Sequence, residues 1–175
     1  MSARTALRAR LTSLLLCLLL VLSACGGTAE SAPVEEGDRY RDFTAALADG
    51  GELTLSDCEG KVILLNFWAT WCSPCVGEMP AFPQLMEKYG DDLALIAVNC
   101  GEDEETVKSF LTKNSYSFPV VLDVEGKVSD LYPSDGIPYT LIITPGGTVS
   151  HIALGAGSAD LMFDEYSREI DKALE

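Results

Sequence analysis

Histidine, basic residues and long hydrophobic runs are scarce in this 175-residue chain, which has one histidine and 12 lysines and arginines against 27 acidic residues. The formal net charge of −15 repels phosphate groups, so the composition excludes a nucleic-acid-binding protein. The longest apolar stretch, 11–22, is too short for a permanent membrane-spanning helix. Apolar residues still make up 47% of the chain, so its length suits one domain with a real core plus accessory segments.

The N-terminus has the pattern of a secretory signal. Three arginines lie within the first ten residues, the apolar stretch 11–22 follows, and small residues come next. Residues 22–25 read Leu-Ser-Ala-Cys and resemble the lipobox of bacterial lipoproteins, in which cleavage precedes the cysteine and the cysteine carries the lipid. The resemblance implies a signal peptide over 1–24 and a lipid anchor at Cys25, on the extracytoplasmic face of a bacterial membrane. An ordinary secretory cleavage site beside an incidental cysteine is the alternative.

Beyond Cys25, the small and polar residues 25–37 predict a flexible tether, and 38–175 are expected to fold as one domain. The run 62–68 is apolar almost throughout, which is typical of a strand buried on both faces of a sheet. We expect strands at 41–48, 52–55, 62–68, 93–99, 119–122, 140–144 and 149–154, and helices at 73–89, 102–114, 128–132 and 159–174. This order predicts an α/β fold, a mixed central sheet with helices on both faces.

A pair of cysteines follows the predicted central strand and opens the predicted helix. The segment reads Trp71-Cys72-Ser73-Pro74-Cys75. A thiolate at a helix N-terminus is stabilised by the helix dipole and by free backbone amides, and the thiolate is the nucleophile in disulfide exchange. We therefore predict a redox-active disulfide in which Cys72 is the exposed attacking residue and Cys75 is shielded.

A zinc site and a static structural disulfide are the other uses of such a pair. Structural zinc takes four ligands, usually from two such pairs, and only Cys58, Cys100 and His151 remain in the domain, without paired spacing. A static disulfide would not require a position between strand and helix. We expect no metal and no cofactor. Cys58 and Cys100 are expected to be buried free thiols and His151 an edge residue, and the acidic run 102–105 is interpreted as a stabilised helix start.

A family resemblance extends this reading. Residues 66–75, Asn-Phe-Trp-Ala-Thr-Trp-Cys-Ser-Pro-Cys, resemble the active site of thioredoxin-like proteins. With Glu78-Met79-Pro80 and the lipobox, the chain is similar to the TlpA/ResA branch over about 38–175. The resemblance implies a thiol-disulfide oxidoreductase with a thioredoxin-like fold, an N-terminal strand extension and an insert after the second central strand, at roughly 102–121.

The same resemblance assigns roles to residues around the pair. Ile137-Pro138 resembles the family's loop in which a cis-proline faces the cysteines, and the Ile137 backbone would pair with an extended substrate segment. An ordinary trans proline is the alternative. Independently of the resemblance, Trp71 adjoins Cys72 and is expected to form part of an apolar docking rim.

Glu78 stands where this branch has a glutamate that assists proton transfer at the cysteines. Thioredoxin itself has a buried aspartate on the preceding strand, and Asn66 occupies that place here and cannot ionise. A solvated helix glutamate is the alternative. Pro80 and Pro83 both fall within the predicted helix 73–89, where each removes a backbone donor.

We expect a monomeric exchanger that acts as a reductant on protein disulfides, because Ser73 and Pro74 carry no cation. The resemblance implies a membrane carrier of the CcdA or DsbD type as electron donor and substrates such as those of cytochrome c maturation. Two alternatives stay open. A thiol-dependent peroxidase would need an arginine beside its cysteine, although none lies between Arg41 and Arg168. A copper-binding assembly chaperone would use the cysteine pair as ligands.

Overall fold

The computed structural model describes residues 32–175, which belong to one compact unit. The predicted signal peptide, Cys25 and the first part of the predicted tether lie outside the described residues. Within the part of the chain that is described, no helix is both long enough and apolar enough to cross a membrane.

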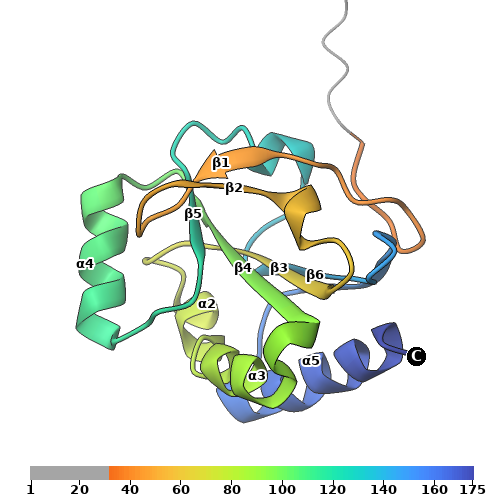
Figure 1. Ribbon diagram of the computed structural model, residues 1–175. Coiled ribbons are helices and arrows are strands. Elements are labelled where there is room, and N and C mark those ends of the chain that lie inside the picture. Colours follow the sequence, from red (N-terminus) through yellow and green to blue (C-terminus); the bar gives the residue numbers. More distant parts are fainter. Residues whose placement is uncertain (1–31) are drawn as a thin grey trace, which may run out of the picture. The chain divides into compact units, whose positions relative to one another are not determined.

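A five-stranded mixed sheet lies at the centre of the fold, in the order β5-β4-β3-β6-β7 (Figure 1). Its strands are β3 (Val62–Trp68), β4 (Leu93–Cys100), β5 (Val120–Asp123), β6 (Tyr139–Ile143) and β7 (Val149–Leu154). The strands β3, β4 and β5 run parallel, whereas β6 and β7 pair antiparallel. Every residue of β3 is buried, because the strand has a neighbour on each side and a packed layer on each face. The predicted central strand is confirmed, and the cysteine segment starts from its C-terminal end.

Three α-helices cover one face of the sheet (Figure 1). They are α2 (Ser73–Glu78), α3 (Ala81–Tyr89) and α5 (Ala159–Ala173). Phe82 and Leu85 of α3 share one buried core with Ile170 of α5 and Leu64 of β3. Each such side chain contributes about 1.5–3 kcal/mol when it leaves water. Helix α2, which begins directly after Cys72 and contains Cys75, packs on the same core.

The opposite face is covered by the N-terminal extension. β1 (Thr44–Ala46) and β2 (Glu52–Thr54) form an antiparallel hairpin over the sheet (Figure 1). The 3₁₀-helices η1 (Leu55–Cys58) and η3 (Ser129–Leu131) complete this layer. Its core contains Ile63, Leu65 and Phe67, the β3 residues that alternate with those of the first face. The helices on both faces and the strand extension are as predicted, and the helices on this face are short.

The helix predicted over 73–89 is divided into α2 and α3, because Pro80 has no amide that could continue the helical hydrogen bonds. Pro83 lies in the first turn of α3, where backbone amides have no intrahelical partners in any case. A 3₁₀-helix, η2 (Gly90–Asp92), then leads from α3 into β4.

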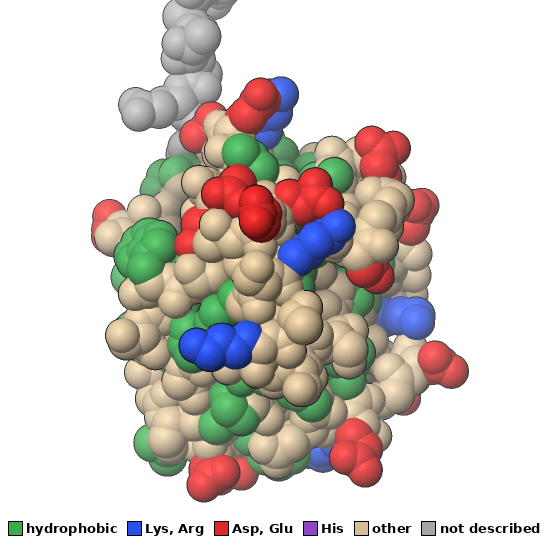
Figure 2. All heavy atoms as spheres, turned by 90° about the vertical axis from the view of Figure 1, so that its left-hand side faces the viewer, with side chains coloured by type: hydrophobic (Ala, Val, Ile, Leu, Met, Phe, Trp, Pro, Cys, Tyr) green, Lys and Arg blue, Asp and Glu red, His purple; other side chains and the backbone are tan. Residues whose placement is uncertain are grey.

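The insert after β4 consists of α4 (Glu104–Asn114) and the edge strand β5. Helix α4 begins two residues later than predicted, because the Asp103 side chain caps it by accepting a hydrogen bond from the Thr106 amide at 2.8 Å. The Phe110 ring lies 5.3 Å from the ring of Trp68 and attaches the helix to the core. Figure 2 shows the side of the molecule that carries α4, with acidic side chains spread among apolar ones.

Candidate active site

Cys72 and Cys75 form a disulfide at the junction between β3 and α2. Their Cα atoms are 5.3 Å apart, within the usual span of a disulfide. Cys72 is the N-cap of α2, and its Sγ accepts a hydrogen bond of 3.3 Å from the Cys75 backbone amide. Pro74 lies in the first turn, where its missing amide leaves no intrahelical bond unmade. A thiolate on Cys72 would therefore meet a donor that is already in place.

The two cysteine residues differ in exposure to solvent, although less than the sequence predicts. Cys72 keeps 5% of its surface exposed and Cys75 keeps none, so the predicted order holds but Cys72 is not freely exposed. One reason is the Ile137 loop, whose carbonyl oxygen lies 3.7 Å from the Cys72 Sγ. Trp71, next to Cys72, is 70% exposed. Cys72 is therefore the more accessible residue of the pair and adjoins an exposed aromatic side chain.

The Ile137-Pro138 peptide bond is cis, as predicted. Pro138 is buried directly before β6, and β6 pairs antiparallel with β3 so that Tyr139 lies opposite Phe67. This register carries the Ile137-Pro138 loop to the end of β3 where the cysteine segment starts. The sheet thus brings together two segments that are 65 residues apart in the chain.

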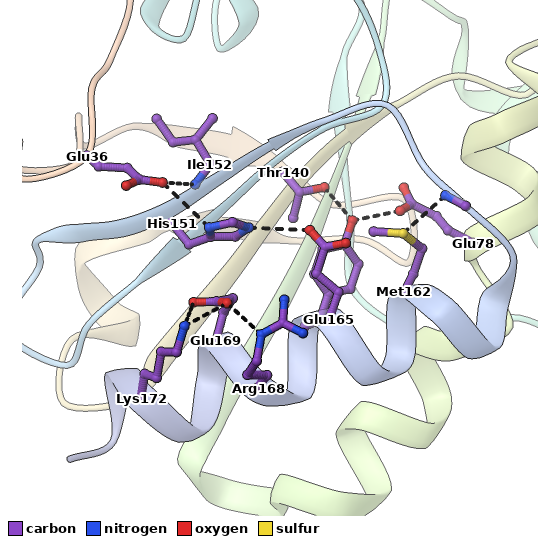
Figure 3. A network of polar contacts seen from close by, with 12 residues as sticks. Glu36, Glu78, Thr140, His151, Ile152, Met162, Glu165, Arg168, Glu169 and Lys172 are labelled. Carbon is purple, nitrogen blue, oxygen red and sulfur yellow. Dashed lines mark hydrogen bonds and ion pairs between the residues drawn. The ribbon is translucent and has the colours of Figure 1, made fainter.

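Glu78 is fully buried, so the alternative of a solvated helix glutamate is wrong. Its Oε1 accepts a hydrogen bond of 2.9 Å from the Asn66 amide, and its Oε2 accepts one of 2.7 Å from the Tyr166 hydroxyl. The Asn66 amide also donates to Thr140 Oγ1 at 2.8 Å, and that oxygen lies 3.0 Å from the Tyr166 hydroxyl. We call these four side chains, from α2, β3, β6 and α5, the polar ring. In Figure 3, dashed lines run from Thr140 and from Glu78 to the same oxygen, which is the Tyr166 hydroxyl on α5.

Burial raises the pKa of Glu78 from its ordinary value of 4.5 to about 7, against the hydrogen bonds from Tyr166 and Asn66, which lower it. The nearby carboxylate of Glu165 also raises this pKa. Burial, and then the charge of Glu78, raise the pKa of Tyr166, so its hydroxyl stays protonated and donates. Cys75 and Glu78 are three positions apart in α2 and so share one helix face. A proton can therefore be held or released near neutral pH one helical turn from Cys75.

Glu102 lies beside the cysteine segment, a contact that the sequence does not predict. The prediction that Glu102 begins a helix is wrong. It lies before α4, and its carboxylate accepts hydrogen bonds from the Thr70 amide at 2.7 Å, the Thr70 hydroxyl, and the Asn99 side chain at 2.8 Å. Thr70 belongs to the turn between β3 and Cys72. Glu102 thus ties the cysteine segment to the end of β4.

Thr140 and Tyr166 are also absent from the sequence-based site. The only signal for Tyr166 is a hydroxyl within the apolar stripe of the last helix, which requires a buried partner. Asn66 is recognised in the sequence as unable to ionise, but its contact with Glu78 depends on the packing of α2 against β3.

Cys58 and Cys100 are free thiols, as predicted, but they are half-buried rather than buried. Burial raises the pKa of both, which keeps them protonated and weakly reactive. His151 lies on the edge strand β7, as predicted, with its ring nitrogens 3.5 Å from Glu36 and 3.4 Å from Glu165 (Figure 3).

Arg41 and Arg168 are the arginines that come before and after the cysteine pair in the sequence, and the structure pairs each with residues outside the site. Arg41 donates to the backbone carbonyls of Leu131 and Ala32, and Arg168 pairs with Glu169 at 3.0 Å. Among residues 32–175, no group of three or more His, Cys, Asp or Glu side chains is arranged to hold a metal ion.

Known proteins are similar to this chain in sequence and in fold. The AhpC/TSA family matches residues 37–152. The thiol-disulfide oxidoreductase ResA of Bacillus subtilis (strain 168) is 32% identical over 154 residues, which cover 84% of this chain and 86% of ResA. A solved structure from Chlorobium tepidum, provisionally described as the thiol:disulfide interchange protein DsbE, is 31% identical with a TM-score of 0.74 and covers 81% of this chain and 99% of its own.

A further solved structure is described as the exposed lipoprotein thioredoxin of Streptococcus pneumoniae strain TIGR4. It is 27% identical with a TM-score of 0.63, and the match covers 73% of this chain and 99% of that one. Together these likenesses confirm the predicted thioredoxin-like fold.

Proposed function

This chain belongs to the AhpC/TSA family and to the thiol-disulfide oxidoreductases named ResA, and we propose that it exchanges disulfides with proteins outside the cytoplasm through Cys72 and Cys75. The observation that carries the proposal is the disulfide between these two residues at the start of α2, in which Cys72 is the less deeply buried residue of the pair.

The reaction starts from the reduced enzyme. The Cys72 thiolate attacks one sulfur of a substrate disulfide, a mixed disulfide forms, and the other substrate sulfur leaves as a thiolate and takes up a proton. Cys75 then loses its proton, and its thiolate attacks the Sγ of Cys72. The second substrate sulfur leaves and is protonated, and the Cys72–Cys75 disulfide remains. The substrate gains two electrons and the enzyme loses two.

Glu78 is the base for the second step. Cys75 is fully buried, so its proton needs an acceptor inside the protein. A carboxyl group whose pKa is about 7 can accept that proton at neutral pH and return it when the enzyme is reduced again. Asn66, which cannot ionise, donates to Glu78 and orients it.

The substrate docks as an extended segment beside the Ile137-Pro138 loop, where the Ile137 backbone pairs with it. Two observations support this. The Ile137 carbonyl lies next to the Cys72 sulfur, and Trp71 presents a large aromatic surface beside the same residue. Aromatic side chains of this kind often carry much of the binding energy in protein interfaces.

We further propose that residues 1–24 are a signal peptide, that Cys25 carries a lipid, and that the segment after it tethers the domain to the extracytoplasmic face of the membrane. The lipobox-like residues 22–25 and the similarity to an exposed lipoprotein support this. The end of the expected tether 25–37 packs on the domain, because Val34 is buried and the Glu36 carboxylate accepts a hydrogen bond from the Ile152 amide. The enzyme acts as a monomeric reductant in a process such as cytochrome c maturation, and a membrane carrier of the CcdA or DsbD type supplies its electrons. The uncharged pair between the cysteines favours a reductant.

Reduction of insulin disulfides in the presence of a dithiol donor tests the exchange. We expect the wild type to accelerate the reaction, Cys72→Ser to abolish the acceleration, and Cys75→Ser to accumulate a mixed disulfide without turnover. Cys100→Ser is the matched control and should retain activity, since Cys100 forms no disulfide. Glu78→Gln should slow turnover about 100-fold at neutral pH. Full activity in Cys72→Ser, or none in the wild type, would overturn the proposal.

A further inference from the structure

The polar ring contains four hydrogen bonds. Asn66, Thr140 and Tyr166 together supply four hydrogens, one for each bond, and a proton on Glu78 would be a fifth. A carboxylate can only accept, so Asn66 and Tyr166 both donate to it. The single hydrogen of the Tyr166 hydroxyl is then used, and its oxygen must accept the hydrogen of Thr140. The Thr140 oxygen in turn accepts the second N–H of Asn66. Every donor of the ring is therefore satisfied, and two of the four hydrogens end on the carboxylate.

A proton on Glu78 would find no acceptor within this arrangement. Each carboxylate oxygen already accepts a hydrogen, from Tyr166 at Oε2 and from Asn66 at Oε1, and both of these groups have their hydrogens directed towards Glu78. Reversing the Tyr166 hydroxyl towards Thr140 would leave the Thr140 hydrogen without its acceptor. Asn66 Oδ1 is buried and has no partner among the described residues, but reaching it would require the amide to turn and break both of its bonds. The hydrogen-bond directions therefore favour the ionised form, in opposition to burial.

We propose that Tyr166 is a positioning residue that keeps Glu78 available as a base by fixing these directions. The inference rests on the proposed role of Glu78 at Cys75. Tyr166 suits this task because it is fully buried on α5 and its own hydroxyl does not ionise in the neutral range. Its bond to Glu78 spans 88 residues and joins α5 to the cysteine-bearing helix α2.

The other groups that face Glu78 do not replace this donor. Asn66 comes from β3 and already uses both of its hydrogens, and Thr140 comes from β6 and reaches Glu78 only through Tyr166 or Asn66. The disulfide lies on α2 and carries no charge. Glu165, from α5, is the remaining charged group that acts on Glu78, and its carboxylate opposes ionisation. Loss of the Tyr166 hydroxyl would therefore leave burial and Glu165 opposed by Asn66 alone.

Titration of the Glu78 carboxyl carbon by ¹³C NMR in the oxidised full chain tests the inference directly. We expect Tyr166→Phe to raise the Glu78 midpoint by about one pH unit or more, because it removes one hydrogen bond to a charged group. Tyr89→Phe is the matched control, since the Tyr89 hydroxyl binds Ser167 and Asp171 outside the ring and its loss should leave the midpoint unchanged. An unchanged midpoint in Tyr166→Phe, or an equal rise in Tyr89→Phe, contradicts the inference.

Thr140→Val tests the same inference if Tyr166→Phe does not fold. Valine keeps the shape of threonine but removes the hydroxyl that donates to Tyr166, so we expect a smaller rise of the Glu78 midpoint. Thr140→Ser restores that hydroxyl and should restore the wild-type midpoint. Equal midpoints in Thr140→Val and the wild type would overturn the inference.

The pH profile of insulin reduction separates this inference from the proposed function. In Tyr166→Phe, the pKa in the rate profile that belongs to Glu78 should rise by the same amount as the NMR midpoint, and the rate at neutral pH should fall by up to about tenfold for each pH unit of that rise. A shifted midpoint together with full activity in Glu78→Gln would keep the inference and remove Glu78 from catalysis. An unmoved midpoint together with an inactive Cys72→Ser variant would remove the inference and keep the exchange activity.

Discussion

Glu102 accepts a hydrogen bond from the backbone amide of Thr70, 32 residues earlier in the chain, at a distance of 2.7 Å. The same carboxylate binds the Asn99 side chain at the end of β4. The turn before Cys72 is thus attached to the sheet through Glu102, and the helix after Cys72 is attached through Glu78 and the polar ring. Two carboxylates, one on each side of the reactive pair, hold the segment that must keep its geometry while its disulfide opens and closes.

We predict that Glu102→Gln lowers the free energy of unfolding by about 1–3 kcal/mol, because it weakens several hydrogen bonds to one charged group. Amide exchange at Thr70 should become faster in the same variant. Denaturant unfolding of the oxidised protein and hydrogen exchange measure the two effects. Glu105→Gln is the control, since Glu105 is exposed in the first turn of α4 and its loss should cost only a few tenths of a kcal/mol. Equal losses in both variants would show that Glu102 only supports the helix.

The raised pKa of Glu78 predicts a specific pH dependence of stability. The folded protein holds this proton up to about pH 7, whereas the unfolded chain releases it near pH 4.5. The folded state therefore binds more protons between these values, and stability falls as the pH rises through this window. Relative to Glu78→Gln, we expect the free energy of unfolding of the wild type to decrease by about 3 kcal/mol between pH 4.5 and a pH above 7.

Denaturant titrations of both oxidised proteins across this range measure the difference. The comparison with Glu78→Gln removes contributions from all other titrating groups, because these are common to both proteins. A constant difference between the two proteins at every pH would mean that Glu78 titrates at its ordinary pKa.

Trp71→Ala should weaken protein substrates without weakening the fold. The side chain is 70% exposed, so the free energy of unfolding should change by less than about 0.5 kcal/mol. Loss of an aromatic docking surface should lower kcat/KM for insulin by about tenfold or more. Leu174→Ala, which removes an exposed apolar side chain at the end of α5, is the control. Steady-state kinetics measure kcat/KM for both variants, and equal values for Trp71→Ala and Leu174→Ala would contradict the prediction.

The cysteine content predicts the thiol chemistry of the mature protein. If Cys25 carries a lipid, the chain from residue 25 onwards holds four thiols after reduction and unfolding, and two when it is oxidised and unfolded. Alkylation followed by intact-mass measurement of protein extracted from membranes counts them. Cys25→Ser should release the protein from the membrane fraction. A fifth thiol, or membrane retention of Cys25→Ser, would contradict the lipid anchor.

The residues that are close in sequence could be interpreted before the fold was known. The spacing of Cys72 and Cys75, the apolar run of β3 and the backbone donor that Pro80 removes from the helix all depend on contacts within a few residues. Such contacts follow from backbone geometry and local hydrogen bonding, which the order of side chains states directly. The family resemblance added the cis bond before Pro138, whose isomer a single sequence does not reveal by itself.

Tertiary structure decided the surroundings of the pair. Asn66 meets Thr140 because the antiparallel register of β3 and β6 places them opposite one another, and Tyr166 meets Glu78 because α5 packs over α2. Glu102 follows β4 in sequence, but its partner Thr70 follows β3, and only the parallel pairing of these strands brings their ends together. Such contacts depend on how separate elements pack, so the sequence by itself identified the cysteine pair and the packing determined which polar groups surround it.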